Sequence, residues 1–575
     1  MSAVMETREH SAKYLSDLQP PLVQHFELMA TAQGGVAKLR ELILTLAVQG
    51  KLVPQDPRDE PASQLLKRVT SEKDRLISAK TIKREKPLVE IGEEDQPFPL
   101  PIGWEWVRLA EIAHPQAGFA FKSTGFNEVG QGVPLIRIRD VGDNNPSTYF
   151  SGDYRDEFVV DSGDWLISMD GEFRVREWCG PRALLNQRVT RLVFYGEELY
   201  RPFVSAALQF KLTELQGTKA YTTVDHLSGG QIAFAVMALP PLAEQSRIVT
   251  RVEELMRLCD ALEAKDQLEA AQHAQLVQTL LGALTASVTP EDLADNWERV
   301  AAHFDLLLDR PEAIDALEQT ILQLAVRGLL VPQDPKDEPA SELLKKIRAE
   351  KDRLIAEGKI KRDKPMEPVA IEDVPFVLPI GWTWVRFDEL IHPLKPIAYG
   401  VLVPGPDVEA GVPFVRIADL SIDNPAPMPE KSIGRDIDSQ FQRTRLEGGE
   451  ILMGVVGSIG KLGVAPATWA GANIARAICR IVPADAGLKE FVLFLLQTEF
   501  MQQSFVGDTR TLAQPTLNVG LIRQALTPVP PPAEQARIVA CVSLLRRHCA
   551  DLRQRLTARQ TTQAHLAEAL IDEVA

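Results

Sequence analysis

Polar side chains able to recognise another molecule lie in loops between short β-rich runs in two parts of the chain. In the first part they are Lys122, Ser123, Arg174, Arg176, Asn186, Gln187, Thr222, Thr223 and His226. In the second part they are Ser458, Lys461, Asn473, Arg476, Arg510, Gln514, Thr516 and Asn518. Arginine pairs with guanine O6 and N7, asparagine or glutamine with adenine N6 and N7, and hydroxyls with either base. These residues therefore suit the reading of DNA bases, and the alternative is that each is solvated or caps a turn.

Residue patterns typical of catalysis do not accompany these side chains. The stretch from Gly454 to Lys461 comes nearest to a phosphate-binding loop, but its glycine spacing is one residue off and Leu462 stands where Ser or Thr would hold Mg²⁺. The sequence contains no GxGxxG, no GxSxG and no Asp/Asn-Pro-Pro-aromatic stretch of the kind with which amino-methyltransferases hold a flipped base. The 9 histidines lack the spacing of metal ligands. We therefore expect no catalytic site and no bound metal in this chain.

Composition sets broad limits on the class of protein. A chain of 575 residues is too long for one compact core and predicts three or four domains. Its 63 Lys and Arg against 79 Asp and Glu give a net charge of −16, which disfavours nucleic-acid binding through a global positive field. Local basic strips or a basic partner subunit can still supply that field. The 5 cysteines form an odd set without a CxxC pair, and no segment indicates secretion or a membrane span, so we expect a cytoplasmic protein without a membrane partner.

An internal repeat organises the chain. The stretch LRELILTLAVQGKLVPQDP from Leu39 matches LEQTILQLAVRGLLVPQDP from Leu317. Near-identical flanks of this kind enclose two divergent middles that keep scattered landmarks, such as GVPLIRIRDV with GVPFVRIADL and Asn186 with Asn473. Shared flanks indicate one scaffold role that is used twice. Divergent middles indicate that each copy recognises something different.

The flanks carry helix signals. Residues 36–50 and 313–328 have helical apolar spacing with a glycine at the end. Longer helices are predicted just after the double prolines of PPLAEQSRIV and PPPAEQARIV, and Glu244 and Glu534 in their first turns suit the positive end of the helix dipole. Their apolar seams are Ile248, Val252, Leu255, Cys259 and Leu262, and Ile538, Val542, Leu545, Cys549 and Leu552. Equivalent seams favour pairing of the two long helices as an antiparallel coiled coil over simple core packing.

The middles have a different pattern. Runs such as 134–139, 165–168 and 188–194 lie between Gly, Asp, Asn and Pro clusters and predict strands in compact modules. The two tryptophans of LPIGWEWV and of LPIGWTWV open the middles, and we expect them to anchor a core and not to stack on bases. Basic strips at 80–86 and 359–364 can hold phosphates or a partner, or can be solvated helix ends.

Together these patterns predict an α/β protein with two globular modules joined by two long-helix regions. The expected segments are a helical segment at 1–98, a first recognition module at 99–239, a central helical region at 240–377, a second recognition module at 378–529 and a C-terminal helix at 530–575.

Five stretches of the sequence carry a family resemblance. They are LAVQGKLVPQDPRDEPASQLLKR, LPIGWEWVRLAEI, GVPLIRIRDV, LLNQRV and LPPLAEQSRIVTRVEELMRLCDALE. This set resembles the specificity subunit of bacterial type I restriction-modification enzymes, over nearly the whole chain and in duplicate. The resemblance implies a non-catalytic subunit whose two target-recognition domains read the two halves of a bipartite, asymmetric double-stranded DNA target. The long helices would set the gap between the halves.

The resemblance also implies partners. Two methyltransferase (M) subunits and two restriction-translocase (R) subunits would join this chain, and S-adenosylmethionine, ATP and Mg²⁺ would belong to those partners. The repeat agrees, because two equivalent flanks offer two equivalent docking surfaces to two identical partners. An alternative is a scaffold that binds a methyltransferase without reading DNA. A self-sufficient nuclease or methyltransferase is disfavoured by the missing motifs.

Overall fold

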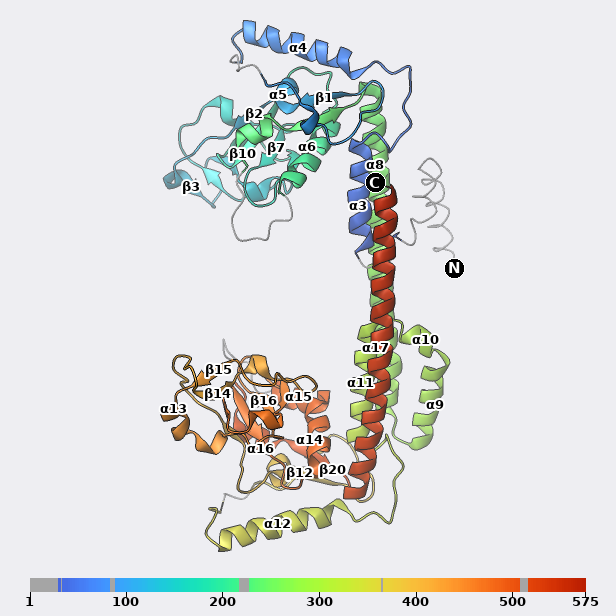
Figure 1. The fold of residues 1–575 in the computed structure, drawn as a ribbon, viewed down its shortest axis with the longest axis vertical. Helices are drawn as coiled ribbons and strands as arrows, with labels where there is room; N and C mark the ends of the chain where they lie inside the picture. The colour runs from blue at the N-terminus through green and yellow to red at the C-terminus, as the bar shows by residue number, and fades with distance from the viewer. Residues whose placement is uncertain are drawn as a thin grey trace. The chain divides into compact units, whose positions relative to one another are not determined.

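The computed structural model describes residues 29–30, 32, 34–82, 88–216, 227–362, 366–506 and 516–574. The chain forms two compact units, which are residues 1–268 with 560–575, and residues 269–559. Both units combine helices with sheets, so the chain is an α/β protein, as predicted (Figure 1). No helix within the described ranges is long and apolar enough to cross a membrane.

The first unit consists of flank helices followed by a module of strands and helices. Its helices are α3 (Gly35–Val48), α4 (Ala62–Ser78), α5 (Leu109–Ile112), α6 (Arg201–Gln216) and α7 (Gly229–Ala233). Its strands are β1 (Glu105–Arg108), β2 (Ala113–Ala117), β3 (Phe126–Asn127), β4 (Val133–Ile136), β5 (Tyr149–Phe150), β6 (Val159–Val160), β7 (Trp165–Ser168), β8 (Val175–Glu177), β9 (Ala183–Leu185), β10 (Val189–Phe194) and β11 (Val236–Leu239).

The second unit repeats this plan with insertions. Its helices are α9 (Pro290–Ala302), α10 (Phe304–Leu307), α11 (Pro311–Val326), α12 (Ala340–Ala356), α13 (Arg435–Gln440), α14 (Leu488–Gln497), α15 (Glu499–Val506) and α16 (Val519–Gln524). Its strands are β12 (Thr383–Arg386), β13 (Ala398–Tyr399), β14 (Val412–Val415), β15 (Lys431–Ile433), β16 (Ile451–Gly454), β17 (Leu462–Val464), β18 (Asn473–Ile474), β19 (Ile478–Ile481) and β20 (Leu526–Val529). The long helices α8 (Leu242–Ala286) and α17 (Pro532–Val574) contribute residues to both units.

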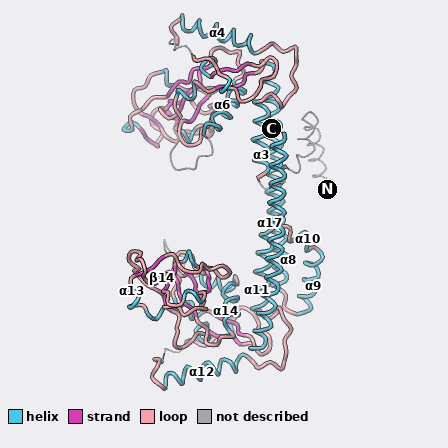
Figure 2. Tube along the Cα trace, in the orientation of Figure 1, coloured by secondary structure: helices cyan, strands magenta, loops and turns pink. Residues whose placement is uncertain are grey.

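Sheet topology is shared by the two modules, which contain the strands drawn in magenta in Figure 2. The antiparallel sheet β2-β10-β7-β8 of the first module corresponds to β13-β19-β16-β17 of the second. A second sheet in each module contains one parallel pair, β4 with β9 and β14 with β18. The first and last strands of each module pair antiparallel, β1 with β11 and β12 with β20. Each module is thus closed where the flanking helices join it.

Two of the three predicted strands are confirmed, and the third is shorter than predicted. β7 matches its predicted run at 165–168, and β10 begins one residue later than its predicted run at 188–194. The run at 134–139 ends earlier, since β4 stops at Ile136. The Arg137 N–H donates to the Asp140 carboxylate (2.7 Å), which turns the chain into a 3-10 helix. The prediction of a strand to residue 139 is therefore wrong.

Apolar seams place the helices as predicted. In α3, Leu39, Ile43 and Leu46 are buried, and Gly50 follows the helix with a φ of +70°, where glycine is favoured. A β-carbon at Gly50 would lie 2.5 Å from the Cγ of Pro101, so close packing excludes other residues as well.

The long helices pack in antiparallel order within each unit. The core of the first unit combines Leu255 and Cys259, from the first part of α8, with Ala567 near the end of α17. The core of the second unit combines Val542, from the first part of α17, with Leu281 near the end of α8. The start of each long helix thus shares a core with the end of the other, which confirms that the two seams are used in equivalent ways.

A buried carboxylate joins three parts of the first unit. Glu244, in the first turn of α8, accepts hydrogen bonds from Trp104 Nε1 and from Gln55 Nε2, each at 3.1 Å. Trp104 opens the module and Gln55 belongs to the flank, so one carboxylate connects flank, module and helix. Trp104 is buried, which confirms its predicted packing role.

The second unit repeats this arrangement. Glu534, in the first turn of α17, accepts hydrogen bonds from Trp382 Nε1 (3.0 Å) and Gln333 Nε2 (2.7 Å). A buried polar group without partners costs about 1–3 kcal/mol, so these paired contacts favour one arrangement of helix, flank and module.

We expect Glu244→Gln to change how stability depends on pH. Burial raises the pKa of the Glu244 carboxyl above its ordinary value. The folded chain therefore binds this proton more tightly than the unfolded chain, and the stability that this group contributes is lost as the pH rises through its folded pKa. The unfolding midpoint of the wild type, relative to Glu244→Gln, should rise as the pH falls from about 7 to about 5. Glu41→Gln, on the exposed side of α3, is the control, and a wild-type advantage that stays constant with pH would contradict the expectation.

Candidate nucleic-acid interface

Four chain segments of the first module meet at one end of the sheet β2-β10-β7-β8. The Gln187 N–H, in the β9–β10 turn, donates to Phe119 O (3.0 Å) in the segment after β2. The Met169 N–H, at the start of the β7–β8 loop, donates to Arg188 O (3.1 Å) in the same turn. The Leu227 N–H donates to Met169 O (2.8 Å) and brings in the segment before α7. We call this arrangement of four segments the loop frame.

The second module builds the same loop frame. The Arg476 N–H donates to Val401 O (2.9 Å), the Val455 N–H to Ala477 O (2.8 Å) and the Leu517 N–H to Val455 O (2.8 Å). These bonds join the segment after β13, the β16–β17 loop, the β18–β19 turn and the segment before α16. Backbone geometry is therefore retained where the two middles have diverged in sequence.

A glycine allows close approach in each loop frame. A β-carbon at Gly118, just after β2, would lie 2.0 Å from the carbonyl oxygen of Asn186. A β-carbon at Gly400, just after β13, would lie 1.8 Å from the carbonyl oxygen of Ile474. Only glycine fits at either position without a shift of the backbone, which fixes the turn against the neighbouring strand.

The loop frames correct one landmark of the repeat. Gln187 and Arg476 donate equivalent backbone hydrogen bonds, so Asn186 is equivalent to Ala475 and not to Asn473. The predicted match of Asn186 with Asn473 is wrong. An identical side chain gave the match, whereas the backbone turn that defines the position does not require asparagine.

Asn473 is a structural residue. It has no exposed surface, and its Nδ2 donates to Asp438 Oδ1 (2.9 Å) and to Phe441 O (3.1 Å). Its Oδ1 accepts a hydrogen bond from Thr444 Oγ1 (2.8 Å). The prediction that Asn473 reads a base is therefore wrong, because its hydrogen-bonding groups are used inside the module.

The other predicted residues differ in exposure. Asn186 is buried, and its Oδ1 accepts no hydrogen bond within the described part of the chain. Arg174 is half-buried. The exposed residues are Lys122, Ser123, Arg176, Gln187, Ser458, Lys461, Arg476, Thr516 and Asn518. The predictions for Thr222, Thr223, His226, Arg510 and Gln514 lie outside the described residues.

Several of these side chains already have partners. Arg174 forms an ion pair with Glu172 (2.7 Å), and Lys461, which occupies the equivalent place before β17, donates to Ile417 O (2.9 Å). The Asn518 side chain accepts the Gly520 N–H (2.8 Å) and caps α16. In the structure Asn518 therefore caps a helix, which is the alternative to base reading for such a polar residue.

Tyr399 is a residue of the second loop frame that the sequence did not reveal. Its hydroxyl donates to Leu517 O (2.9 Å) and accepts the Val519 N–H (2.7 Å), so it ties the end of β13 to the start of α16. Burial raises the pKa of this hydroxyl above its ordinary value. No local pattern could have indicated the role, because its partner Leu517 is 118 residues away along the chain.

Comparison with known proteins decides the family. Residues 101–272 match the family model described as the type I restriction modification DNA specificity domain. The specificity subunit of the type I restriction enzyme EcoAI from Escherichia coli is 35% identical over 572 residues, which cover 94% of this chain and 93% of that protein. The chain belongs to the specificity subunits of type I restriction enzymes.

One further relative and one solved structure are also similar to this chain. The EcoEI specificity subunit from Escherichia coli is 36% identical over 578 residues, covering 94% of this chain and 93% of that protein. A chain in a solved type I restriction-modification system is 18% identical with a TM-score of 0.42, covering 83% of this chain and 99% of that chain.

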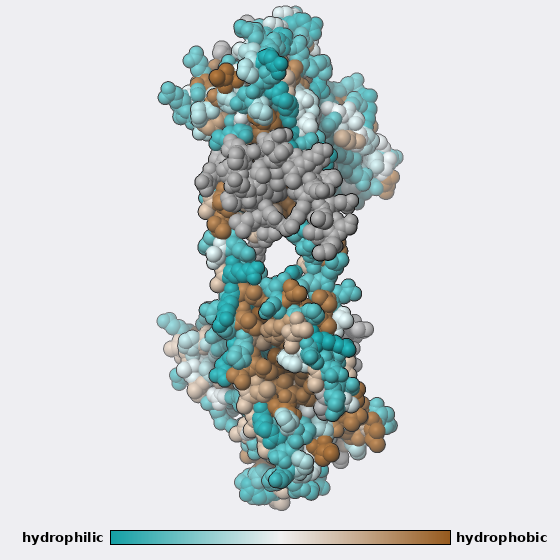
Figure 3. Space-filling model, turned by 90° about the vertical axis from the view of Figure 1, so that its right-hand side faces the viewer, coloured by the Kyte–Doolittle hydropathy of each residue, from teal (hydrophilic) through white to brown (hydrophobic). Residues whose placement is uncertain are grey.

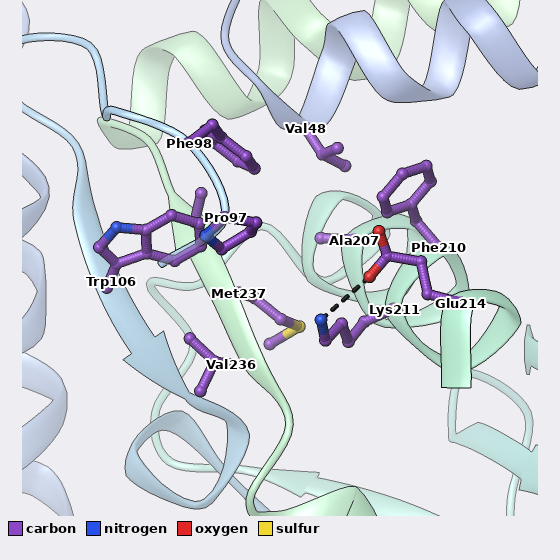
Figure 4. Close-up of a pocket in the computed structure, with 11 residues that line it drawn as sticks. Val48, Pro97, Phe98, Trp106, Ala207, Phe210, Lys211, Glu214, Val236 and Met237 are labelled. Atoms are coloured by element: carbon purple, nitrogen blue, oxygen red, sulfur yellow. Dashed lines mark hydrogen bonds and ion pairs between the residues drawn. The ribbon is translucent and has the colours of Figure 1, made fainter. Parts of the chain in front are cut away.

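An apolar hollow in the first unit of the specificity subunit lies outside the loop frame. It is lined from α3, β1, α6 and β11, with Phe98 and Trp106 on one side (Figure 4). Its charged residues Lys211 and Glu214 bind each other at 2.9 Å. In the second unit Phe376 and Trp384 are the equivalent aromatic pair. The ring of Phe500 packs on both, with its centroid 5.8 Å from that of Phe376 and 6.1 Å from that of Trp384. Since Lys211 and Glu214 neutralise each other and the rest of the lining is apolar, the chemistry of the hollow suits packing.

We expect Asn473→Ala to destabilise the specificity subunit without altering its recognition of DNA. The change removes the four hydrogen bonds of the Asn473 side chain, which join it to Asp438, Phe441, Thr444 and the Ile474 N–H inside the module. The expected loss is about 1–3 kcal/mol of unfolding free energy. Thermal unfolding of the full chain measures the loss, and mapping of methylated bases measures recognition. A changed target sequence with unchanged stability would restore Asn473 as a reading residue.

Proposed function

We propose that each module of this specificity subunit reads one half of a bipartite, asymmetric double-stranded DNA target. The loop frame carries the proposal, because it is the same in both modules while the exposed side chains on it differ. A common backbone with different hydrogen-bonding groups suits the reading of two different half-sites.

The long helices complete this proposal. We propose that α8 and α17 set the gap between the half-sites, which supports an interrupted target. Each helix contributes residues to both units, and the start of each shares a core with the end of the other. Such reciprocal packing suits a spacer of constant length.

The duplicated flanks suit two identical partners, proposed to be methyltransferase subunits. Ile102 and Ile380 occupy the same place in LPIGWEWV and LPIGWTWV and are 96% and 92% exposed. A large apolar side chain held in water twice at equivalent positions indicates a surface that another protein covers.

A second apolar surface lies on the second unit. Figure 3 shows apolar side chains, in brown, on the face that carries α9 and α10. Val288, Trp297 and Leu306 are exposed there. This surface supports further protein contacts, for which the two restriction-translocase subunits are the proposed partners.

Catalysis is assigned to the partners in this proposal. The specificity subunit would act without chemistry of its own in the cytoplasm, while the M and R subunits would bring S-adenosylmethionine, ATP and Mg²⁺. In the described part of the chain no group of three or more His, Cys, Asp or Glu residues is placed to hold a metal ion. The mostly buried Cys549 thiol has its pKa raised by burial and does not resemble an activated nucleophile.

Methylated-base mapping tests the proposed function. Long-read sequencing would compare cells that have this gene with cells that lack it, the methyltransferase partner being expressed in both. We expect loss of methylation at one bipartite, gapped, asymmetric sequence when the gene is removed. Unchanged methylation, together with capture of the methyltransferase by the purified chain, would favour the scaffold that binds a partner without reading DNA.

A further inference from the structure

We propose that Gln187 and Arg476 are the equivalent base-reading side chains of the two modules, Gln187 for an adenine in one half-site and Arg476 for a guanine in the other. This inference rests on the proposed function, since it assigns a base to a residue within each half-site. It follows from three properties that the two residues share.

The first property is an identical place in the loop frame. The Gln187 N–H donates to Phe119 O (3.0 Å), and the Arg476 N–H donates to Val401 O (2.9 Å). Each acceptor belongs to the segment that follows the equivalent strand, β2 or β13. The two side chains therefore leave equivalent backbone positions.

The second property is a rigid support. The turn that carries Gln187 is closed by the Val189 N–H on Asn186 O (2.9 Å), and the turn that carries Arg476 by the Ile478 N–H on Ala475 O (2.9 Å). The close glycine packing described above holds each turn against a strand end. A reading side chain on a fixed turn loses less conformational freedom when it binds, which favours specific hydrogen bonds.

The third property is availability. Gln187 and Arg476 are exposed, and neither side chain has a hydrogen bond or ion pair within the described ranges. The other equivalent pair behaves differently, because Arg174 binds Glu172 and Lys461 binds a backbone carbonyl. The pair Gln187 and Arg476 therefore has polar groups available to a ligand, whereas the polar groups of Arg174 and Lys461 are already bound within the module.

The identity of the bases follows from hydrogen-bond chemistry. A glutamine amide presents an N–H donor beside a carbonyl acceptor, which match N7 and N6 of adenine, whereas a guanidinium presents two parallel N–H donors, which match O6 and N7 of guanine. A bidentate contact discriminates against the wrong base by roughly 5- to 150-fold. One exchanged side chain on a common turn would give the two modules different targets.

The test uses the full chain expressed with its methyltransferase partner in a host that has no other type I system, followed by methylated-base mapping. Gln187→Ala should relax one adenine in one half-site, and Arg476→Ala one guanine in the other, with roughly 5- to 150-fold loss of preference at that position. Gln187→Arg should move the preference at its position from adenine to guanine. Gln272→Ala and Arg547→Ala, exposed on the long helices, are the matched controls and should leave the target unchanged.

The outcomes separate this inference from the proposed function. A wild-type chain that directs no gapped methylation would overturn both. A wild-type target that stays the same in Gln187→Ala and Arg476→Ala would overturn the base assignment alone. Folding is checked within each experiment, because a folded variant still specifies every other position of the target. A variant that loses the whole target while its unfolding temperature is unchanged would also contradict the assignment to a single base.

Discussion

The buried carboxylate at the start of each long helix is the interaction on which the architecture depends. Glu244 and Glu534 each accept a tryptophan N–H from the entrance of a module and an amide N–H from a flank. Without these partners the carboxylate would be buried at a large cost, so helix, flank and module are favoured as one arrangement. The same contacts recur in both copies, where Gln55 and Gln333 lie in the shared stretch VPQDP. Gln55 also donates to the Gly50 carbonyl and Gln333 to the Gly328 carbonyl, so each amide connects the carboxylate to the end of a flank helix.

A fixed support allows the modules to diverge. Because each module is closed by its first and last strands and joined to the helix beside the carboxylate, loop insertions and side-chain changes can accumulate at its other end. The loop frame shows how far the divergence reaches. Its backbone bonds survive in both modules, whereas the exposed residue on the turn is glutamine in one and arginine in the other. Under the proposed function, exchange of side chains on this constant backbone would change the target.

Local and repeated features were predictable from the sequence. The end of α3 at a glycine, the starts of α8 and α17 after prolines and the extent of β7 all follow from signals within a few residues. Long-range partners were not predictable. Glu244 was expected to suit a helix dipole, but Gln55 and Trp104, which bind it, lie 189 and 140 residues away. Asn473 was matched by residue type to a turn, whereas its hydrogen bonds to Asp438 place it inside the module. The base contacts of the remaining exposed residues stay predictions.

Exchange of one module tests the central claim most directly. Residues 101–238 would be replaced by the corresponding residues of a related specificity subunit with a different target, and the methylated sequence would be mapped in cells. The account predicts that one half-site changes to that of the donor, while the other half-site and the gap between them stay the same. A change in both half-sites, or in the gap alone, would contradict two independent readers on a common scaffold.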